Sequence, residues 1–329
     1  MFRKFSCIVA MIAVIMTGVS WSAHGAEYPE RNISVICPFG AGGGTDLATR
    51  ALAENAKQHL NNVEIVVENK TGGAGAIGLV AAMTSNPDGY TLNSICMEML
   101  TLSKLGLAPA ELTPAAFVPL ANVNMEPAAI TVRKDAPWNT LKEFIEDAKK
   151  RPGAISLANA GTGGIWHLAA IGLELRSGAS FKHIPYEKGA VEALPAVLGG
   201  HVDAVGVSAS EVSANVASGE LRILGVASEK RLEAFPNVPT YAEQGYDLKI
   251  SAFRGIGVPA GSKDKPIPAA IVKKLQDAFY KSAVSENCKT MIKNAKLTYT
   301  PMNAEETSKM IVDQETLFDQ IIAEYMKKK

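Results

Sequence analysis

The feature of this sequence that most constrains its fold is an alternation of short apolar runs with longer amphipathic segments, starting at Ile33. Buried strands of parallel sheets read as short apolar runs, and the covering helices alternate with them along the chain. The alternation therefore predicts an α/β protein with mostly parallel sheets flanked by helices. The expected strands are 33–37, 63–67, 90–96, 155–158, 182–184, 201–207, 222–226 and 251–258. The expected helices are 45–60, 76–83, 140–149, one that follows residue 164 and ends near Arg176, 188–198, 268–284 and 304–326.

The length of the chain predicts two domains. Its 329 residues correspond to two units of about 150 residues each. The apolar stretch 118–132 is long enough to lead from one domain into the other, and the tail after residue 228 carries too little sheet to stand alone. We expect residues 26–130 and 228–329 to form domain 1 and residues 131–227 to form domain 2. The chain then crosses twice, near Thr131 and Ala227, which makes a hinge and a cleft.

The N-terminus has the pattern of a secretory signal. Arg3 and Lys4 precede the apolar run 5–19, and small residues stand at Ala23 and Gly25. A run of this length is shorter than the roughly 20 residues of a membrane-spanning helix. We interpret residues 1–25 as a cleavable signal peptide, the alternative being a buried N-terminal helix, and expect the mature protein in the periplasm. The formal charge of zero argues against nucleic acid as a partner.

The cysteines and histidines predict neither a metal site nor a cofactor. Once Cys7 leaves with the signal, an odd number of cysteines remains, and burial as small hydrophobic residues is favoured for Cys37 and Cys96. No CxxC or HxxxH spacing occurs. Gly73–Gly78 matches G-x-G-x-x-G, but five residues separate it from the preceding strand, whereas a dinucleotide fingerprint begins at the turn itself. We therefore predict no metal and no cofactor.

Three glycine-rich loops, 38–44, 72–78 and 159–164, each lie between an expected strand and an expected helix. Open α/β sheets bind ligands at the carboxyl ends of their strands, and the unpaired N–H groups of a helix N-terminus attract anions. Two domains that each present such a loop suit a ligand carrying carboxylates. The alternative is that these glycines only make tight turns.

Candidate catalytic residues are few. Ser208 lacks the final glycine of a nucleophile elbow, and no acid and histidine follow it in the usual order. Asp46 begins the first expected helix, so structural capping and ligand contact are both open. Asp203 is the only charge in an apolar strand and should face either the cleft or a fixed partner. An exported enzyme with Asp203 as its acid or base is therefore the alternative to a binding protein.

Several ordered motifs together resemble the Bug family, the substrate-binding proteins of tripartite tricarboxylate transporters. The resemblance covers essentially the whole mature chain, and its motifs are Tyr28-Pro29, the loops 38–46 and 68–75, Pro87-Asp88-Gly89-Tyr90-Thr91-Leu92, 159–163 with His167-Leu168, His183-Ile184-Pro185-Tyr186, 199–203 and 236–240. It implies a non-enzymatic, monomeric periplasmic protein of the two-domain, type II-like binding-protein fold. Such a protein closes on a small carboxylate and delivers it to integral membrane permease subunits, the alternative outlet being a sensor kinase.

The resemblance also implies where the ligand lies, because the family holds carboxylates mainly by backbone N–H groups and water between two glycine loops. Carried over residue by residue, the binding residues are Phe39, Gly40, Ala41, Thr45 and Asp46 on one side and Ala160, Gly161, Thr162 and Gly163 on the other, with Ser94, Lys188, Asp203 and Ser208 from neighbouring strand ends. Residues 96–100 and Ile165-Trp166 are bulkier than is usual, so an apolar or aromatic body between carboxylates is plausible, with simple repacking as the alternative. Arg254 is either a bidentate carboxylate partner or a structural arginine.

Overall fold

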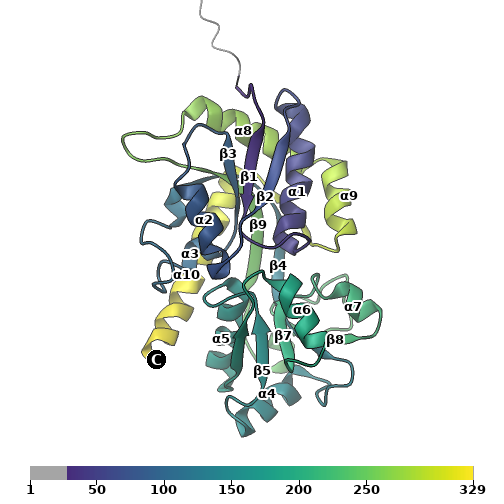
Figure 1. Cartoon of the computed structure of the whole chain (residues 1–329). Coiled ribbons are helices and arrows are strands. Elements are labelled where there is room, and N and C mark those ends of the chain that lie inside the picture. Colours follow the sequence, from purple (N-terminus) through teal and green to yellow (C-terminus); the bar gives the residue numbers. More distant parts are fainter. Residues whose placement is uncertain (1–27, 329) are drawn as a thin grey trace, which may run out of the picture.

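The computed structural model describes residues 28–328, which form two α/β lobes joined by a continuous ten-stranded sheet (Figure 1). The sheet runs in the order β2-β1-β3-β9-β4-β7-β5-β6, with β8 and β10 also paired to β4. The predicted signal peptide lies outside the described residues.

The first lobe contains the amino-terminal strands and the helices drawn above the middle of Figure 1. Strands β1 (Ile33–Cys37), β2 (Ile65–Asn69) and β3 (Thr91–Ile95) are parallel, and β9 (Ser251–Pro259) lies antiparallel to β3. The helices of this lobe are α1 (Gly44–Ala56), α2 (Ala76–Met83), α3 (Glu98–Thr101), α8 (Ala269–Ala283) and α9 (Glu286–Asn294).

The second lobe repeats the parallel arrangement. Strands β5 (Ser156–Asn159), β6 (Lys182–Pro185) and β7 (Ala204–Ser208) are parallel to one another, and β8 (Leu221–Val226) lies antiparallel to β4. Its helices are α4 (Leu141–Lys150), α5 (Ile165–Ser177), α6 (Ala190–Leu198) and α7 (Ser213–Ala217). Short 3₁₀ turns complete the described chain at Lys57–His59, Gly73–Gly75, Pro114–Ala116 and Ala242–Gln244.

Strand β4 (Phe117–Arg133) belongs to both lobes and coincides with the apolar stretch expected to lead between domains. Its first part pairs with β9 and with β10 (Tyr299–Met302), and its last part pairs with β7 and β8. The predicted α/β class is confirmed, and each lobe contains a parallel set of strands. The sheet as a whole is mixed and not mostly parallel as predicted, because every strand that pairs with β4 is antiparallel to it.

The return crossing differs from the expected position near Ala227. Tyr241 and Gln244 bond to the backbone of β8, and the Leu141 N–H donates to Gln244, so residues 239–244 are fixed to the second lobe. The chain returns only where Ile250 bonds Ala227 and Ala128 and leads into β9. The segment after Ala227 lacks a strand-and-helix pattern, and its backbone groups find their partners on β8, which the sequence alone did not indicate.

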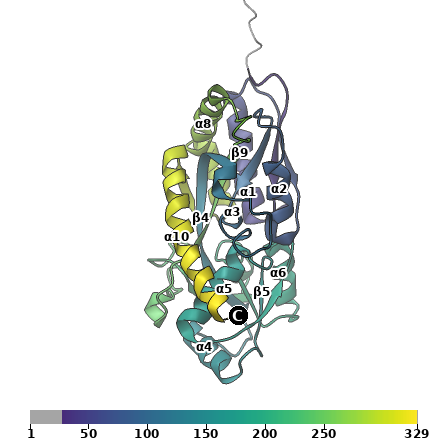
Figure 2. The same ribbon diagram turned by 90° about the vertical axis from the view of Figure 1, so that its left-hand side faces the viewer.

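The carboxy-terminal helix α10 (Ala304–Lys328) spans both lobes, although we expected it to fold back on domain 1 alone. Figure 2 shows it running along one side of the molecule toward α5, and its Arg176–Glu324 pair joins it to that helix. Lys104 contacts both Glu315 and Asp319 of α10. The helix therefore packs across the line where the two lobes meet.

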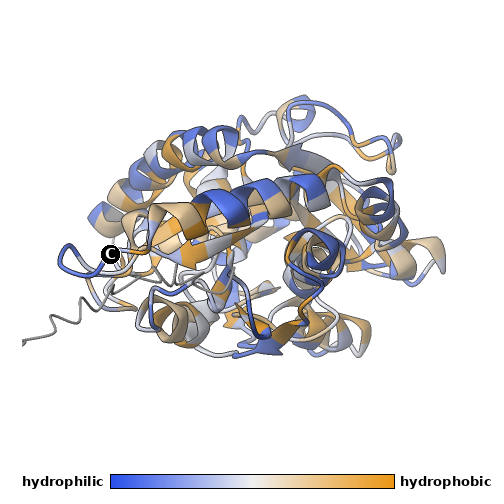
Figure 3. Cartoon of the chain, turned by 90° about the horizontal axis from the view of Figure 1, so that it is seen from above, coloured by the Kyte–Doolittle hydropathy of each residue, from blue (hydrophilic) through white to orange (hydrophobic). Residues whose placement is uncertain are grey.

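Most predicted elements are present, several of them with shifted limits, and some elements were not predicted. Strand β2 begins two residues later than predicted, because residues 60–63 close the turn after α1. The short elements α3, α7, α9 and β10 were not predicted. Figure 3 shows hydrophilic and hydrophobic residues alternating along the outer helices, as expected for helices that cover a sheet. Between residues 28 and 328, no helix combines the length and apolar character that crossing a membrane requires.

The cysteines in the described residues, Cys37, Cys96 and Cys288, are free and buried, which confirms the burial predicted for Cys37 and Cys96. Burial raises the pKa of Cys37 to about 11 and that of Cys288 to about 12, and it raises the pKa of Cys96 well above its ordinary value. Thiolates are therefore scarce at neutral pH. We expect Ellman's reagent to modify the native protein at least about a hundredfold more slowly than the protein in urea. Rapid labelling of one native thiol would contradict this burial.

Phe318 of α10 is fully buried, whereas Val312 on the same helix is 61% exposed. Because Phe318 packs in the core shared with α5, replacing it by alanine leaves a cavity there. We expect Phe318→Ala to lower the free energy of unfolding by about 3–5 kcal/mol, measured in urea. Val312→Ala is the matched control and should change it by less than about 0.5 kcal/mol. Equal effects of the two substitutions would show that α10 does not stabilise the fold in this way.

Candidate functional site

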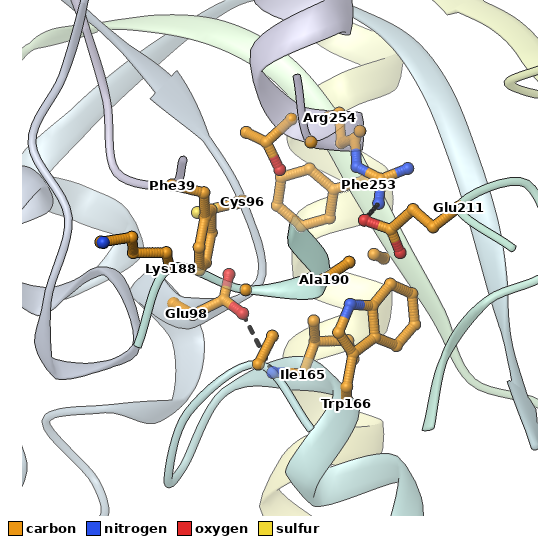
Figure 4. A pocket seen from close by; sticks show the side chains of 16 residues that line it. Phe39, Cys96, Glu98, Ile165, Trp166, Lys188, Ala190, Glu211, Phe253 and Arg254 are labelled. Carbon is orange, nitrogen blue, oxygen red and sulfur yellow. Dashed lines mark hydrogen bonds and ion pairs between the residues drawn. The ribbon is translucent and has the colours of Figure 1, made fainter. Parts of the chain in front are cut away.

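A cavity lies between the lobes at the carboxyl ends of their parallel strands and holds about 430 Å³ of empty space, part of it open to solvent (Figure 4). Open α/β sheets place ligands at this position. The first lobe contributes the loop after β1, the segment after β3 and residues of β9. The second lobe contributes the loop after β5, the start of α5, the loop before α6 and the loop after β7.

The loop after β1 presents the N-terminus of α1 to the cavity. The N-cap is Gly43, which has no side chain to accept from the helix, and Gly44 and Thr45 both line the cavity. The first N–H groups of a helix have no partner within the helix, so those of Gly44 and Thr45 are donors for a ligand. A Cβ on Gly44 would come within 2.6 Å of the Arg254 guanidinium carbon. Glycine at 44 is therefore what lets Arg254 lie against this helix end.

The loop after β5 differs from the loop after β1, because two of its backbone N–H groups already donate to side chains of the protein. The Gly163 N–H donates to His167 Nδ1, and the Ile165 N–H donates to Glu98 Oε1 at 3.0 Å. Glu98 comes from α3 in the first lobe and is 1% exposed. Burial raises the pKa of its carboxyl, although the Ile165 N–H opposes that rise. Gly161, at a φ of +98°, packs so closely on Ala74 that a Cβ would lie 2.8 Å from the Ala74 methyl.

Arg254 of β9 is the buried cation of the cavity, with 3% of its side chain exposed. Its Nη2 lies 3.3 Å from Glu211 Oε1, and its Nη1 donates to Asn124 at 2.9 Å. Among the described residues, Arg254 Nε has no hydrogen-bond partner. Buried arginines are normally paired at each donor, so this N–H marks unused capacity for an acceptor.

Glu126 of β4 lies behind Arg254. Its Oε1 accepts from Asn124 and from the Thr298 N–H, and burial raises the pKa of its carboxyl despite the nearby Arg254 charge. Its other oxygen has no partner within the described residues. The Arg254 charge thus acts on two carboxyls, that of Glu211, which lines the cavity, and that of Glu126, which does not.

Hydrogen bonds join the two lobes around the cavity. The Gly40 N–H donates to the Lys188 carbonyl at 3.3 Å, and the Ala74 N–H donates to Glu187 at 3.1 Å. The Thr101 hydroxyl donates to the Gly163 carbonyl at 3.2 Å. Together with the Glu98 and Arg254 contacts, these bonds hold the lobes against one another on several sides of the cavity.

The structure brings some of the sequence-predicted site residues to the cavity and leaves others outside it. Phe39, Thr45, Ala160 and Lys188 line it. The other predicted residues of the two loops shape the walls without lining it; they are Gly40, Ala41, Asp46, Gly161, Thr162 and Gly163. Ser94 is buried and bonds to Thr49, and Ser208 bonds to Ser210 and Glu211.

Asp46 and Asp203 have structural partners instead of a place in the cavity. Asp46 accepts from the Gly42 N–H, Arg50 and Asn69, and these bonds lower its pKa although burial works against them. Asp203 accepts from the backbone N–H and hydroxyl of Ser156 at the amino end of β7. Since the cavity is at the carboxyl end of β7, Asp203 lies at the wrong end of its strand to meet a ligand there.

Sequence reasoning missed several lining residues, among them Gly43, Gly44, Glu98, Glu211 and Phe253. It left open whether Cys96, Met97, Trp166 and Arg254 face the cleft; Cys96, Trp166 and Arg254 line the cavity, and Met97 does not. The glycines belonged to a loop already singled out, so extending the site to the end of that loop would have found them. Glu98 and Glu211 had no local signal, because their partners are distant in sequence.

The raised pKa of Glu126 predicts a pH dependence of stability. The folded state binds the Glu126 proton more tightly than the unfolded chain, so this group's contribution to stability falls as pH rises from the ordinary value of 4.5 through the raised pKa. Glu126→Gln cannot titrate. We therefore expect the variant to gain stability relative to the wild type as pH rises through that window, measured by urea unfolding at several pH values. A difference that does not vary with pH would contradict the assignment.

Comparison with known proteins gives a consistent set of matches. A family model described as the tripartite tricarboxylate transporter family receptor matches residues 48–326. The Cupriavidus necator protein named UPF0065 protein in gbd 5'region is 32% identical over 300 residues, which covers 90% of this chain and 88% of that protein. Protein BugT of Bordetella pertussis is 32% identical over 285 residues, covering 85% of this chain and 86% of BugT.

Solved structures match along the same length. A TctC solute-binding protein from Polaromonas is 36% identical with a TM-score of 0.67, and the match covers 90% of this chain and 99% of that one. The periplasmic binding protein BugD is 29% identical with a TM-score of 0.80 over 90% and 98% of the two chains.

Two more distant structures, both 21% identical, share the fold and contain ligands. MatC from Rhodopseudomonas palustris, with bound malate, has a TM-score of 0.80 over 90% of this chain and all of that one. R. palustris Rpa4515, with adipate, has a TM-score of 0.78 over 90% and 97% of the two chains.

Proposed function

Because this chain belongs to the family of tripartite tricarboxylate transporter receptors, which are solute-binding proteins and not enzymes, we propose that it captures a small carboxylate in the cavity between its lobes. The single observation that carries the proposal is that open N–H groups at the α1 N-terminus lie beside the Arg254 side chain, so that two kinds of donor are close together. Helix N-terminal donors and an arginine fork both suit a carboxylate. The malate and adipate held by MatC and Rpa4515 support this ligand class.

The carboxylate binds against Gly44, Thr45 and the Nε–H of Arg254 in this proposal. Phe39 and Lys188, which the resemblance to the family indicated, also line the cavity, and Ala160 of the loop after β5 does so as well. Gly40, Ala41, Gly161, Thr162 and Gly163 shape the walls through their backbone, whereas Asp203 is not part of the site.

Ligand capture is coupled to movement of the lobes in this proposal. The chain crosses between them within β4 near Ala128 and again near Ile250, where Ala128, Ala227 and Ile250 bond one another. A turn about this pair of crossings opens the cavity by breaking the bonds that join its rims. The ligand favours the closed form to the extent that it binds that form more tightly.

The proposed place of action is the periplasm, from which the loaded receptor delivers its ligand to integral membrane permease subunits. BugD, which the chain resembles over nearly its whole length, is a periplasmic binding protein. The pattern of residues 1–25 agrees with export.

The proposal predicts that carboxylates stabilise the protein. A ligand at one hundred times its dissociation constant adds about 2.7 kcal/mol to the free energy of unfolding. We expect at least one acid in a panel of mono-, di- and tricarboxylates to raise the melting temperature and to bind measurably in isothermal titration. Arg254→Met should weaken that binding at least about tenfold, because it removes a charged donor.

Asp203→Asn is the matched control, since Asp203 lies at the far end of β7, and it should leave the affinity unchanged. Circular dichroism and urea unfolding establish that both variants fold. Failure of every acid in the panel to stabilise the wild-type protein would overturn the proposed function.

A further inference from the structure

The lining of the cavity differs at its two ends, and the difference bears on how many carboxylates a ligand carries. At the α1 end, the N–H groups of Gly44 and Thr45 and the Nε–H of Arg254 are open donors. At the α5 end, the corresponding donor is already in use, because the Ile165 N–H donates to Glu98. Figure 4 shows this bond at the wall of the cavity opposite Arg254.

At the N-terminus of α5, the Glu98 carboxyl accepts the hydrogen bond that a ligand carboxylate would otherwise accept. The N-cap of α5 is Gly164, which supplies no side-chain acceptor, so the first N–H of the helix is capped from the other lobe. A carboxylate at this position also offsets the positive end of the helix. The position is filled whether or not the Glu98 carboxyl carries its proton, because an oxygen of either form accepts the hydrogen bond.

The charges of the lining favour a ligand with a single negative group. Its cations, Arg254 and Lys188, already contact carboxylates, since Arg254 pairs with Glu211 and Lys188 lies 3.3 Å from Glu192. Lys188 is also 60% exposed, so solvent screens it. A ligand with two carboxylates would bring its second charge toward Glu98, where the described residues provide no uncommitted cation.

Aromatic rings line the space between the two ends. Phe39, Trp166 and Phe253 all face the cavity, and the last two are almost fully buried. Transfer of apolar ligand surface onto such rings is favourable, whereas a second carboxylate would lose its hydration there without a partner. The body of the ligand is therefore apolar or aromatic.

We propose that Glu98 is a specificity-determining residue that takes the place of a second ligand carboxylate, so that the cavity selects monocarboxylates with an apolar body over dicarboxylates. This inference rests on the proposed function and narrows its ligand class. The carboxylate of the ligand binds at the α1 end beside Arg254, and the far end of the ligand meets Glu98 and the rings.

The test uses pairs of acids that differ only in the second carboxylate, namely hexanoate with adipate and benzoate with terephthalate. Isothermal titration of the wild-type protein should show the monocarboxylate of at least one pair binding at least about tenfold more tightly than its partner, as expected for an unpaired buried charge. A dicarboxylate that binds as tightly as its monocarboxylate partner, or more tightly, in the wild-type protein overturns the inference and leaves the proposed function standing. If no acid of either pair or of the wider panel binds, both this inference and the proposed function are contradicted.

Variants at position 98 test whether Glu98 causes the preference for the monocarboxylate. Glu98→Ala uncovers the Ile165 N–H and should improve the affinity for the dicarboxylate at least about tenfold relative to its monocarboxylate partner. Glu98→Gln keeps an acceptor oxygen on that N–H and should retain most of the preference for the monocarboxylate. Glu111→Ala, which removes the same side chain from an exposed position of the same lobe, should leave the preference unchanged.

The result that overturns the role of Glu98 is an unchanged preference in a folded Glu98→Ala protein. If that variant does not fold, the wild-type comparison of paired acids and the Glu98→Gln protein still decide the question. Loss of the monocarboxylate preference in Glu98→Gln, while Glu111→Ala retains it, would contradict the proposal, because the glutamine keeps an acceptor on the Ile165 N–H.

Discussion

The structure depends on the pairing of β4, a strand shared by two lobes. Most of its residues are buried, and the N–H and C=O groups of a buried strand must find partners on both sides. In the first lobe β9 and β10 supply those partners, and in the second lobe β7 and β8 do so. The register of these pairs fixes which residues of β9 and which loop after β7 meet at the cavity. The pairing of Arg254 with Glu211 is therefore a product of sheet geometry.

Much of the fold could be predicted because the strands carry their own signal. The run Ile33–Cys37 is apolar except at Ser34, as is typical of a central parallel strand, and the structure gives it the predicted limits. Strand β2 was misplaced by two residues because it lies at the edge of the sheet, where Val66 is exposed and the apolar run no longer marks the paired residues. The short strand β10 was missed because its four residues are only partly buried and gain their order from β4.

The candidate site was predictable only in its local part. Glycine loops before helices show in the sequence because special backbone geometry needs particular residues, and the resemblance to the Bug family placed Phe39, Thr45 and Ala160 in two of these loops. The presence of acidic residues in the cavity could not be predicted from such local patterns. Glu98 caps a helix of the other lobe 67 residues away, and Arg254 of β9 pairs with Glu211 in the loop after β7. Such contacts depend on how the two lobes meet, and no local pattern encodes that.

Because Gly44 fits closely under the Arg254 guanidinium, the residues accepted at positions 44 and 254 depend on one another. Any side chain at residue 44 would collide with a group that can move only by giving up its bonds to Asn124 and Glu211. Losing the arginine first would leave Glu211 buried without its cation. Each substitution alone therefore carries a cost in stability, so the two positions should change together within a lineage. A relative with a larger residue in place of Gly44 is then a protein that recognises its ligand by another cation, or by none.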